Sequence, residues 1–520
     1  MDALGPLNEA DYARACERAR QKFGLNQLQA EAFVKACREG RNLFLTGGAG
    51  VGKSHTAHKI IDHLHGVLVA NPEVPGDPIG IVAPTGTAAQ IASTRTTRAW
   101  TLHRFFCIRG VNRQPGSYAA RARGEPTDDD IILMALDAVP EEVVGNELET
   151  ACLDSNAIGR LRALQFLVID EISMVDSNML QAINDGLRLA RASSELWGGV
   201  KVLACGDLFQ LAPVSDDPVW CFESPLWPSF QEVELTEVVR QGDDAEFAEA
   251  LARMRKDEMV PGDIRYLNNR SCHDVTRKAE FHLMLKNKDV EKANDEALTD
   301  FPGELHTFPV KKELDEIISV RPFDREPYDA GPRLVDYPRE HPKGAWPLTI
   351  KQGAPVQCTK NVYLYSGGKA DLVIARRERG VVLRLPTEND DTILVRWNAI
   401  GLMAARVTEV HRARKAKRQT WESEERGNPV VASLSYFPLK PSFASTIHSA
   451  QGMTIDCSVD VNVTAWNKPN GRWLMSRPAL AYVAISRATK LSHIRFVMGE
   501  KLQSGHVHLT PKVAARYQLP

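Results

Sequence analysis

The segment Asn42-Leu43-Phe44-Leu45-Thr46-Gly47-Gly48-Ala49-Gly50-Val51-Gly52-Lys53-Ser54 decides the fold of this chain. It contains an apolar run of strand length, then the pattern G-x-x-x-x-G-K-[ST], and a helical run follows at 56–64. Glycines let backbone N–H groups close around a β-phosphate, Lys53 neutralises the β- and γ-phosphate oxygens, and the Ser54 hydroxyl ligates Mg²⁺. The strand–loop–helix context separates this loop from a glycine-rich turn that matches by chance. It predicts a site for ATP and Mg²⁺ formed by Gly47, Gly48, Ala49, Gly50, Val51, Gly52, Lys53, Ser54 and His55.

Further apolar runs of strand length occur in the first half of the chain, at 79–83, 166–169 and 200–204. Each run ends in a cluster of Gly, Thr, Asp or Pro residues. Ligands of an open parallel α/β sheet bind beyond the carboxyl ends of the strands. Together with the strand before the phosphate loop, these runs therefore predict one shared site. Similar runs return only near the end, at 455–463 and 494–498.

Polar residues at two of these strand ends suit phosphoryl transfer. Asp170 can hold Mg²⁺ on the water side of Ser54, and Glu171 can polarise the attacking water. Gln210 can sense the γ-phosphate through a hydrogen bond. Taken singly, each motif also fits an ordinary solvated strand end. Next to the phosphate loop, they predict a hydrolytic site.

Arg240 and Arg487 lie far from the loop in the sequence. Phosphoryl transfer needs positive charge on the equatorial oxygens, and arginines delivered from a second domain supply it. Because most arginines are surface residues, spacing alone does not assign either one.

Composition bounds the class of protein. The 520 residues suffice for roughly three or four domains, and the 43% hydrophobic and 25% charged content is that of a globular protein. No apolar run approaches the ~18 residues of a membrane span, and the N-terminus lacks the blocks of a secretion signal. The nine cysteines form no Cys-x-x-Cys pair, which argues against a zinc site or a disulfide framework. We expect no membrane partner and a soluble protein, either cytoplasmic in a prokaryote or virus-infected cell or nuclear in a eukaryote.

The net charge of −2 predicts that any nucleic acid lies in a local basic groove. Two stretches compete for this role. The run 411–418 has five Lys or Arg residues in eight, although a charge run is also typical of a solvated face. The rival is the basic segment 109–123, which belongs to a stretch, 107–159, that reads as an insertion. Further along, 322–343 resembles a connector and 348–438 has the runs of a small β domain.

The motifs occur in an order that resembles the Pif (petite integration frequency) family of superfamily-one DNA helicases, in its RecD-like branch. The resemblance rests on 47–54, 83–86, 101–106, 170–174, 206–214, 240–241, 446–452 and 482–488. It implies an α/β fold with two RecA-like domains, each a parallel sheet flanked by helices, and ATP between them. It also implies a small wedge insertion in the first domain and an SH3-like β insertion in the second. The expected boundaries are 1–220 with the insertion 107–159, then 221–347 and 439–520, with 348–438 as the β domain.

The same resemblance assigns further residues. Gln29 would read the adenine, Arg240 and Arg487 would complete the catalytic site, and Gln451 and Gly452 would face the nucleotide. The residues implied to contact DNA are Thr85, Thr87, His103 and Phe105 in the first domain and Thr446 and His448 in the second. Phe105 is the expected base-stacking ring, and the alternative is that Phe105 and Phe106 are both buried in the core. Ser449 stands where the family commonly has Lys, Ala212 stands where it has Pro, and 465–477 is unusually long and polar.

The resemblance implies an ATP-dependent helicase that moves 5′ to 3′ on single-stranded DNA and acts at single/double-strand junctions. We expect a monomer that works with accessory replication or repair proteins. Three alternatives remain open: a motor subunit of a nuclease complex, an ATP-gated single-strand-binding remodeller, and a nucleotide switch. The strand-binding motifs at 101–106 and 446–452 argue against the switch.

Overall fold

The computed structural model describes residues 7–69, 77–94, 96–106, 155–213, 219–241, 244–271, 279–315, 347–360, 362–366, 369–374, 376–387, 390–398, 406–411, 413–418, 431–461, 479–496, 502 and 509–519. The chain forms two compact units. The first comprises Met1–Asn287, Ile400–Met403 and Ser445–Pro520, and the second comprises Lys288–Ala399 and Ala404–Ala444. No helix within the described residues is both long and apolar enough to cross a membrane.

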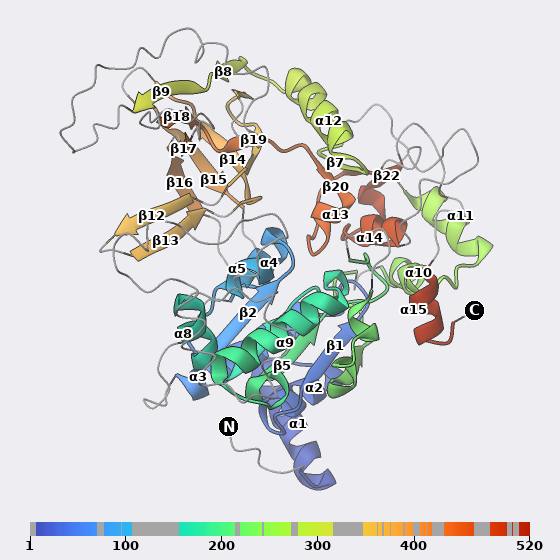
Figure 1. The fold of residues 1–520 in the computed structure, drawn as a ribbon. Coiled ribbons are helices and arrows are strands. Elements are labelled where there is room, and N and C mark those ends of the chain that lie inside the picture. Colours follow the sequence, from blue (N-terminus) through green and yellow to red (C-terminus); the bar gives the residue numbers. More distant parts are fainter. Residues whose placement is uncertain are drawn as a thin grey trace, which may run out of the picture. The chain divides into compact units, whose positions relative to one another are not determined.

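The first unit contains a parallel sheet of six strands in the order β3-β2-β4-β5-β1-β6 (Figure 1). The strands are β1 (Leu43–Gly47), β2 (Ile79–Ala83), β3 (Ala99–Thr101), β4 (Phe166–Ile169), β5 (Lys201–Cys205) and β6 (Gln231–Leu235). The runs at 42–46, 79–83, 166–169 and 200–204 are thus confirmed as neighbouring strands. Their carboxyl ends share one edge of the sheet because every pairing is parallel.

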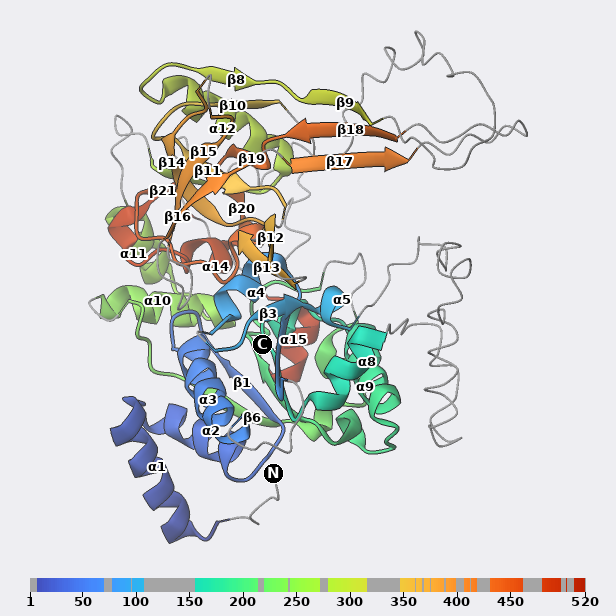
Figure 2. The same cartoon turned by 90° about the vertical axis from the view of Figure 1, so that its left-hand side faces the viewer.

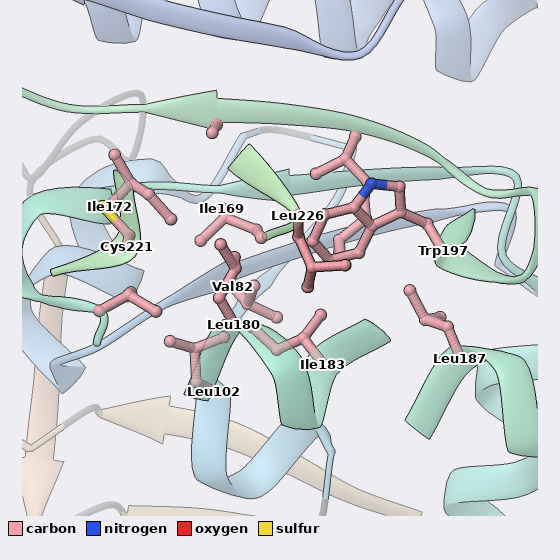
Figure 3. Packing of buried hydrophobic residues seen from close by; sticks show 14 of the residues in the cluster. Val82, Leu102, Ile169, Ile172, Leu180, Ile183, Leu187, Trp197, Cys221 and Leu226 are labelled. Carbon is pink, nitrogen blue, oxygen red and sulfur yellow. The ribbon is translucent and has the colours of Figure 1, made fainter. Parts of the chain in front are cut away.

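Helices cover both faces of this sheet. Figure 2 shows α2 (Gln27–Cys37) and α3 (Lys53–Leu68) on one side of β1, with α8 (Ser155–Ala163) and α9 (Ser177–Arg191) on the other. Side chains of a strand alternate between the two faces. Phe44 therefore joins the cluster of Leu180, Ile183 and Trp197, part of which is drawn in Figure 3. Its neighbours Leu43 and Leu45 pack with the opposite cluster, which includes residues of α1 (Glu9–Phe23), α2, α3 and α4 (Gly86–Ala92).

A second sheet of the same unit has the order β20-β7-β21-β22. Its strands are β7 (Phe281–Met284), β20 (Ala444–Thr446), β21 (Val459–Val461) and β22 (Ile494–Phe496). Helices α10 (Ala245–Lys256), α11 (Pro261–Arg270), α13 (Ile447–Ala450) and α14 (Leu480–Ile485) share a core with them. The sequence runs at 455–463 and 494–498 thus contain β21 and β22.

The last described helix, α15 (Pro511–Arg516), packs on the first sheet's domain rather than on the second. Val513 is buried in the same cluster as Phe44. Lys512 pairs with Glu223 at 3.2 Å, and Arg516 pairs with Glu232 at 3.0 Å. The chain thus returns to the first domain after completing the second sheet.

The expected boundary between the RecA-like domains at 220/221 differs from the observed sheets. Strand β6 lies beyond that boundary, yet it belongs to the first sheet because Gln231–Leu235 pairs with β1 along its whole length. The sequence of an edge strand does not show which sheet the strand joins. Because β6 pairs with β1, the first domain extends beyond residue 220 to the end of β6.

The second unit is built mainly of antiparallel strands. It contains α12 (Asn287–Asp300) and a five-stranded sheet in the order β16-β15-β14-β11-β19. The strands of this sheet are β11 (Pro355–Cys358), β14 (Arg379–Arg384), β15 (Ile393–Trp397), β16 (Arg406–Val410) and β19 (Leu439–Pro441). Smaller sheets pair β8 (His306–Phe308) with β10 (Leu348–Ile350), β12 (Val362–Ser366) with β13 (Lys369–Ile374), and β17 (Ala413–Arg418) and β9 (Lys311–Asp315) with β18 (Val431–Tyr436).

Several expectations remain predictions. The range 348–438 contains most of these strands, but its SH3-like class is a prediction. The basic run 411–418 includes β17, whose contact with DNA is likewise untested. The insertion 107–159 falls outside the described residues except for the beginning of α8.

Candidate functional site

One pocket of the first unit, about 260 Å³ in volume, collects most of the predicted catalytic residues. It lies at the carboxyl edge of the first sheet, where the loop between β1 and α3 meets the ends of β4 and β5. Residues from the second sheet's domain complete its wall. Its lining is Ala49, Gly50, Gly52, Lys53, Ser54, His55, Asp170, Glu171, Gly206, Gln210, Val239, Arg240, Gly452 and Arg487.

The conformation of the phosphate loop between β1 and α3 requires glycine at several positions. Gly47, Gly50 and Gly52 have φ angles of 139°, 82° and 87°, which L side chains rarely adopt. A Cβ atom on Gly47 would lie 2.2 Å from the carbonyl oxygen of Leu235. The chain can therefore approach β6 this closely only without a side chain.

Lys53 begins α3 and points its amino group back into the loop. Its Nζ donates to the carbonyl oxygens of Gly47 and Gly48, both at 2.8 Å. Burial lowers the pKa of Lys53, while the charges of Asp207 and Glu171 oppose that shift. Val51 packs in the core at 2% exposure and is not among the residues that line the pocket, so its side chain supports the loop from the core.

Asp170 and Glu171 follow β4 at the pocket wall. Burial raises the pKa of Asp170 to about 7, and the charge of Glu171 adds to the shift. Glu171 has a φ of 52°, a strained backbone for a residue with a side chain. Its Oε2 accepts a hydrogen bond of 3.0 Å from Nε2 of Gln451. Gly452 follows directly, and a Cβ atom there would lie 3.3 Å from Oε1 of Glu171.

Both arginines expected from sequence reach the same pocket. Arg240 Nη1 donates to the carbonyl oxygen of Ser486 at 3.0 Å, and Arg487 Nε donates to that of Val483 at 3.0 Å. Burial lowers the pKa of both residues, and the charge of Arg487 adds to the shift of Arg240. Guanidinium groups stay charged in proteins. Two cations held together in a desolvated wall favour an anionic ligand between them.

Of the two glutamines expected in the first domain, Gln210 lines the pocket, whereas Gln29 is not among the lining residues and contacts the phosphate loop instead. Gln210 donates from Nε2 to Oδ2 of Asp207 at 3.2 Å, while no described residue donates to its buried Oε1. Gln29 closes the capping box that begins α2, since its Oε1 accepts from the N–H of Asn26. Its Nε2 donates to the carbonyl oxygen of Val51 at 3.3 Å.

The sequence did not single out three residues that support this site. Tyr482 Oη accepts a hydrogen bond from the N–H of Ala49 at 2.8 Å and donates to Asp207 Oδ2 at 3.3 Å. Arg255 Nε donates to Asp207 Oδ1 at 3.0 Å, and its Nη1 donates to Glu234 at 2.8 Å. Asp207 and Tyr482 lie in the motifs 206–214 and 482–488, close to Gln210 and Arg487. That position in the sequence could have identified them as supporting residues. Arg255 lies in α10, outside every motif, and the sequence offered no signal for it.

The residues expected to contact DNA fall at the ends of both sheets. Thr85 and Thr446 are the N-caps of α4 and α13, and their hydroxyls accept from the N–H groups of Ala88 and Ser449. His103 is exposed and His448 is half-buried. The side chain of Thr87 lies outside the described residues.

The expected role of Phe105 as a base-stacking ring is wrong for this structure. Phe105 is only 3% exposed and Phe106 only 1%, and their rings pack against each other at 5.2 Å. The alternative that both rings are buried is therefore correct. The helix α5 (Leu102–Phe105) turns its apolar face into the core, which leaves His103 and Arg104 exposed.

The pocket and the sheets define a class, the P-loop nucleotide-binding proteins with two RecA-like domains. Residues 24–276 match a family model described as an AAA domain. The chain is 29% identical over 478 residues to the human ATP-dependent DNA helicase PIF1, covering 91% of this chain and 60% of that protein. It is 27% identical over 467 residues to Pif1 of Bdellovibrio bacteriovorus, covering 89% and 85%.

Solved structures agree in fold. Pif1 helicase from Candida albicans superposes with a TM-score of 0.65 at 22% identity, covering 95% of this chain and 98% of that chain. Pif1 from Bacteroides bound to single-stranded DNA gives a TM-score of 0.64 at 22% identity, with coverages of 95% and 96%. The curated relatives and the solved structures that this chain resembles are thus Pif1 helicases of both eukaryotes and bacteria. The chain spans about 60% of the length of the human relative.

Proposed function

We propose that this chain is an ATP-dependent DNA helicase that translocates 5′ to 3′ on single-stranded DNA and unwinds duplexes. One observation carries the proposal: a single pocket holds Lys53, Asp170 and Glu171 from the first domain and Arg487 from the second. A nucleotide bound there would join the two domains, so its hydrolysis would change how they sit together. Pif1 of Bacteroides, a protein of the same fold, has been crystallised with ADP-AlF3 and single-stranded DNA.

The residues present suit ATP with Mg²⁺. Among the described residues there is no cluster of three or more His, Cys, Asp or Glu side chains suited to a metal. Mg²⁺ is usually held in such sites by one or two carboxylates together with substrate phosphates, and Ser54 and Asp170 would supply the protein ligands. The bound ion would neutralise charge on the β- and γ-phosphate oxygens.

The remaining groups divide the catalytic work. Lys53 would leave its two carbonyl partners for the β- and γ-phosphate oxygens. Glu171, held by Gln451, would orient the attacking water and accept its proton. Arg240 and Arg487 would stabilise the charge that develops on the transferred phosphoryl group. The unpaired Oε1 of Gln210 would accept a hydrogen bond from the same water, and its Nε2 would report the change through Asp207.

The strand itself would lie across the carboxyl ends of both sheets. Thr85, Thr87 and His103 would hold its backbone on the first domain, and Thr446 and His448 would hold it on the second. Gln29 would read the adenine of ATP. We further propose a monomer that acts at single/double-strand junctions with accessory replication or repair proteins, in a cytoplasmic or nuclear compartment.

Unwinding of 5′-tailed and 3′-tailed DNA duplexes tests the proposal, with Lys53→Ala as the inactive control. Unwinding of the 5′-tailed duplex alone, lost in Lys53→Ala, is the expected result. Hydrolysis stimulated by single strands without unwinding would favour an ATP-gated remodeller. Unwinding that needs an added nuclease partner would favour a motor subunit of a nuclease complex. Absence of any stimulation by single strands would refute the motor.

A further inference from the structure

Next to the buried Phe105, the side chain of Trp100 is partly exposed. It lies in the middle of β3, the edge strand of the first sheet, and pairs in register with Val82. Part of the indole packs against the core cluster that contains Phe105 and Phe106. The core thus fixes the position of the ring, while part of the ring remains exposed to solvent. A ring on which a base stacks needs both properties.

Positive charge gathers around this one ring. The guanidinium carbons of Arg104, Arg98 and Arg160 lie 4.5, 5.1 and 5.8 Å from its centroid. Arg104 lies in α5, Arg160 lies in α8 and Arg98 immediately precedes β3, so three separate segments converge on the indole. Arg160 is fixed there because its Nη2 donates to the carbonyl oxygen of Phe105 at 2.5 Å. In a chain with 64 basic and 66 acidic residues, such a cluster is a local feature rather than a reflection of overall charge.

The position matches the expected path of a strand. Ala83 and Thr101 are register partners on β2 and β3. Thr85 and His103 each follow these partners by two residues, so both lie just beyond the carboxyl ends of neighbouring strands. Trp100 directly precedes Thr101. The platform therefore borders the residues expected to hold the DNA backbone.

A structural role for the cluster is the competing explanation. Arginine stacked on tryptophan adds to stability at many protein surfaces. That role needs one cation, however, and would not bring three guanidinium groups to the same ring, where like charges repel each other. A polyanion with flat bases satisfies both features at once, because its phosphates offset the charges and a base covers the indole.

We propose that Trp100 stacks against a base of single-stranded DNA and that Arg98, Arg104 and Arg160 contact the flanking phosphates. The site deepens the proposed helicase function and rests on it. It replaces Phe105 as the stacking residue of the first domain.

Binding of a fluorescently labelled oligodeoxythymidylate to the full chain, measured by anisotropy across a salt series, tests this site. Trp100→Leu keeps an apolar side chain but removes the aromatic face, and it is expected to weaken binding about tenfold. Trp100→Phe, which keeps a smaller face, should lose less. Arg104→Gln should reduce the slope of log affinity against log salt by about one. Arg18→Gln, at an exposed position of α1, is the matched charge control and should leave the slope unchanged.

Folding is checked by thermal melting and by ATP hydrolysis without DNA, which none of these variants should alter. Because Arg104 is exposed, its variant keeps the test decisive if Trp100→Leu melts early. Wild-type affinity in both Trp100→Leu and Trp100→Phe, or an unchanged salt slope in Arg104→Gln, would overturn the site while leaving the helicase proposal intact. Failure of the wild-type chain to bind the oligonucleotide would overturn both.

Discussion

Tyr482 and Ala49, separated by 433 positions in the sequence, are joined by a hydrogen bond of 2.8 Å from the backbone N–H of Ala49 to the phenol oxygen. The same phenol donates to Asp207, which is fully buried and also accepts from Arg255. The phosphate loop, the end of β5 and two helices of the second domain thus meet at one carboxylate. If the loop moves when nucleotide binds, these hydrogen bonds would transmit the movement to α10 and α14.

Replacing Tyr482 with Phe should therefore raise the KM for ATP about tenfold. The substitution leaves the partly buried Ala49 N–H without its phenol partner, and an unsatisfied donor shielded from solvent costs about 1–3 kcal/mol. Steady-state hydrolysis measures the effect. Tyr266→Phe is the control, because that hydroxyl also bonds an aspartate, Asp244 at 2.9 Å, but away from the loop. Equal KM values in the two variants would contradict a role of Tyr482 in the loop.

Gly50→Ala should lower kcat for ATP hydrolysis by about a hundredfold, because misplacing a catalytic group by about 1 Å has that effect. The new methyl group would lie 2.6 Å from Cβ of Arg240 and 3.0 Å from Oε1 of Gln241. Gly24→Ala supplies the same positive-φ strain at the end of α1, where a Cβ atom meets nothing within 4 Å. That control should melt earlier than wild type yet keep its kcat. A normal kcat in Gly50→Ala would argue against Arg240 as a catalytic residue.

Asp460 should stabilise the second sheet in a pH-dependent way. Burial alone would raise the pKa of Asp460, but hydrogen bonds from His282 and Arg495 on the adjacent strands outweigh it and hold the pKa below its usual value. The folded chain then binds this proton less readily than the unfolded chain. The stabilisation is therefore present above about pH 4 and is lost as the pH falls through the folded-state pKa.

Asp460→Asn should accordingly reduce the free energy of unfolding by about 1.5–3 kcal/mol at pH 7, and the deficit should shrink below about pH 4. Urea unfolding at pH 7, 5 and 3.5 checks this. Asp456→Asn, whose side chain is 73% exposed, should show little deficit at any of these values. A deficit for Asp460→Asn that stays constant down to pH 3.5 would exclude the carboxylate charge as its cause.

Two arginines of one helix offer a matched pair. Arg255 is 5% exposed and pairs with the buried Asp207, whereas the side chain of Arg253 is 35% exposed and pairs with Asp263. Arg255→Gln should lower the free energy of unfolding by about 3–5 kcal/mol, because it leaves a buried charge without its partner. Arg253→Gln should cost less, since solvent screens the guanidinium and the buried Asp263 keeps its hydrogen bond from the Val260 N–H. Denaturant titrations measure both variants. Similar decreases in the free energy of unfolding would show that the burial of the arginine does not determine how much each pair contributes.

The residues that sequence located best are those whose chemistry fixes the local backbone. The phosphate loop needs glycine at positive φ and a lysine at the start of a helix, so Gly47–Ser54 could be placed from pattern alone. Asp170 and Gln210 follow because the carboxyl ends of parallel strands share one edge. Arg240 and Arg487 could be chosen only by resemblance, since their partners, such as Ser486, lie across the pocket.

What sequence missed depends on packing between distant segments. Phe105 and Trp100 are both aromatic and five positions apart, and only the turn of α5 decides which one is buried. Arg255 faces Asp207 across 48 positions, and no periodicity marks that pair. Strand β6 reads as the beginning of a second domain until its pairing with β1 is known.

The return of α15 to the first domain would constrain how the proposed motor can move. The second RecA-like domain is linked to the first at both of its ends: through the segment after β6, and through the segment that leads to Val513 and Arg516. Two covalent links leave a domain fewer ways to move than a single link would. For the motor proposed above, we expect hydrolysis to turn the second domain about the line that joins its two links. Cutting the chain between β22 and α15 should remove this restriction without removing a catalytic residue.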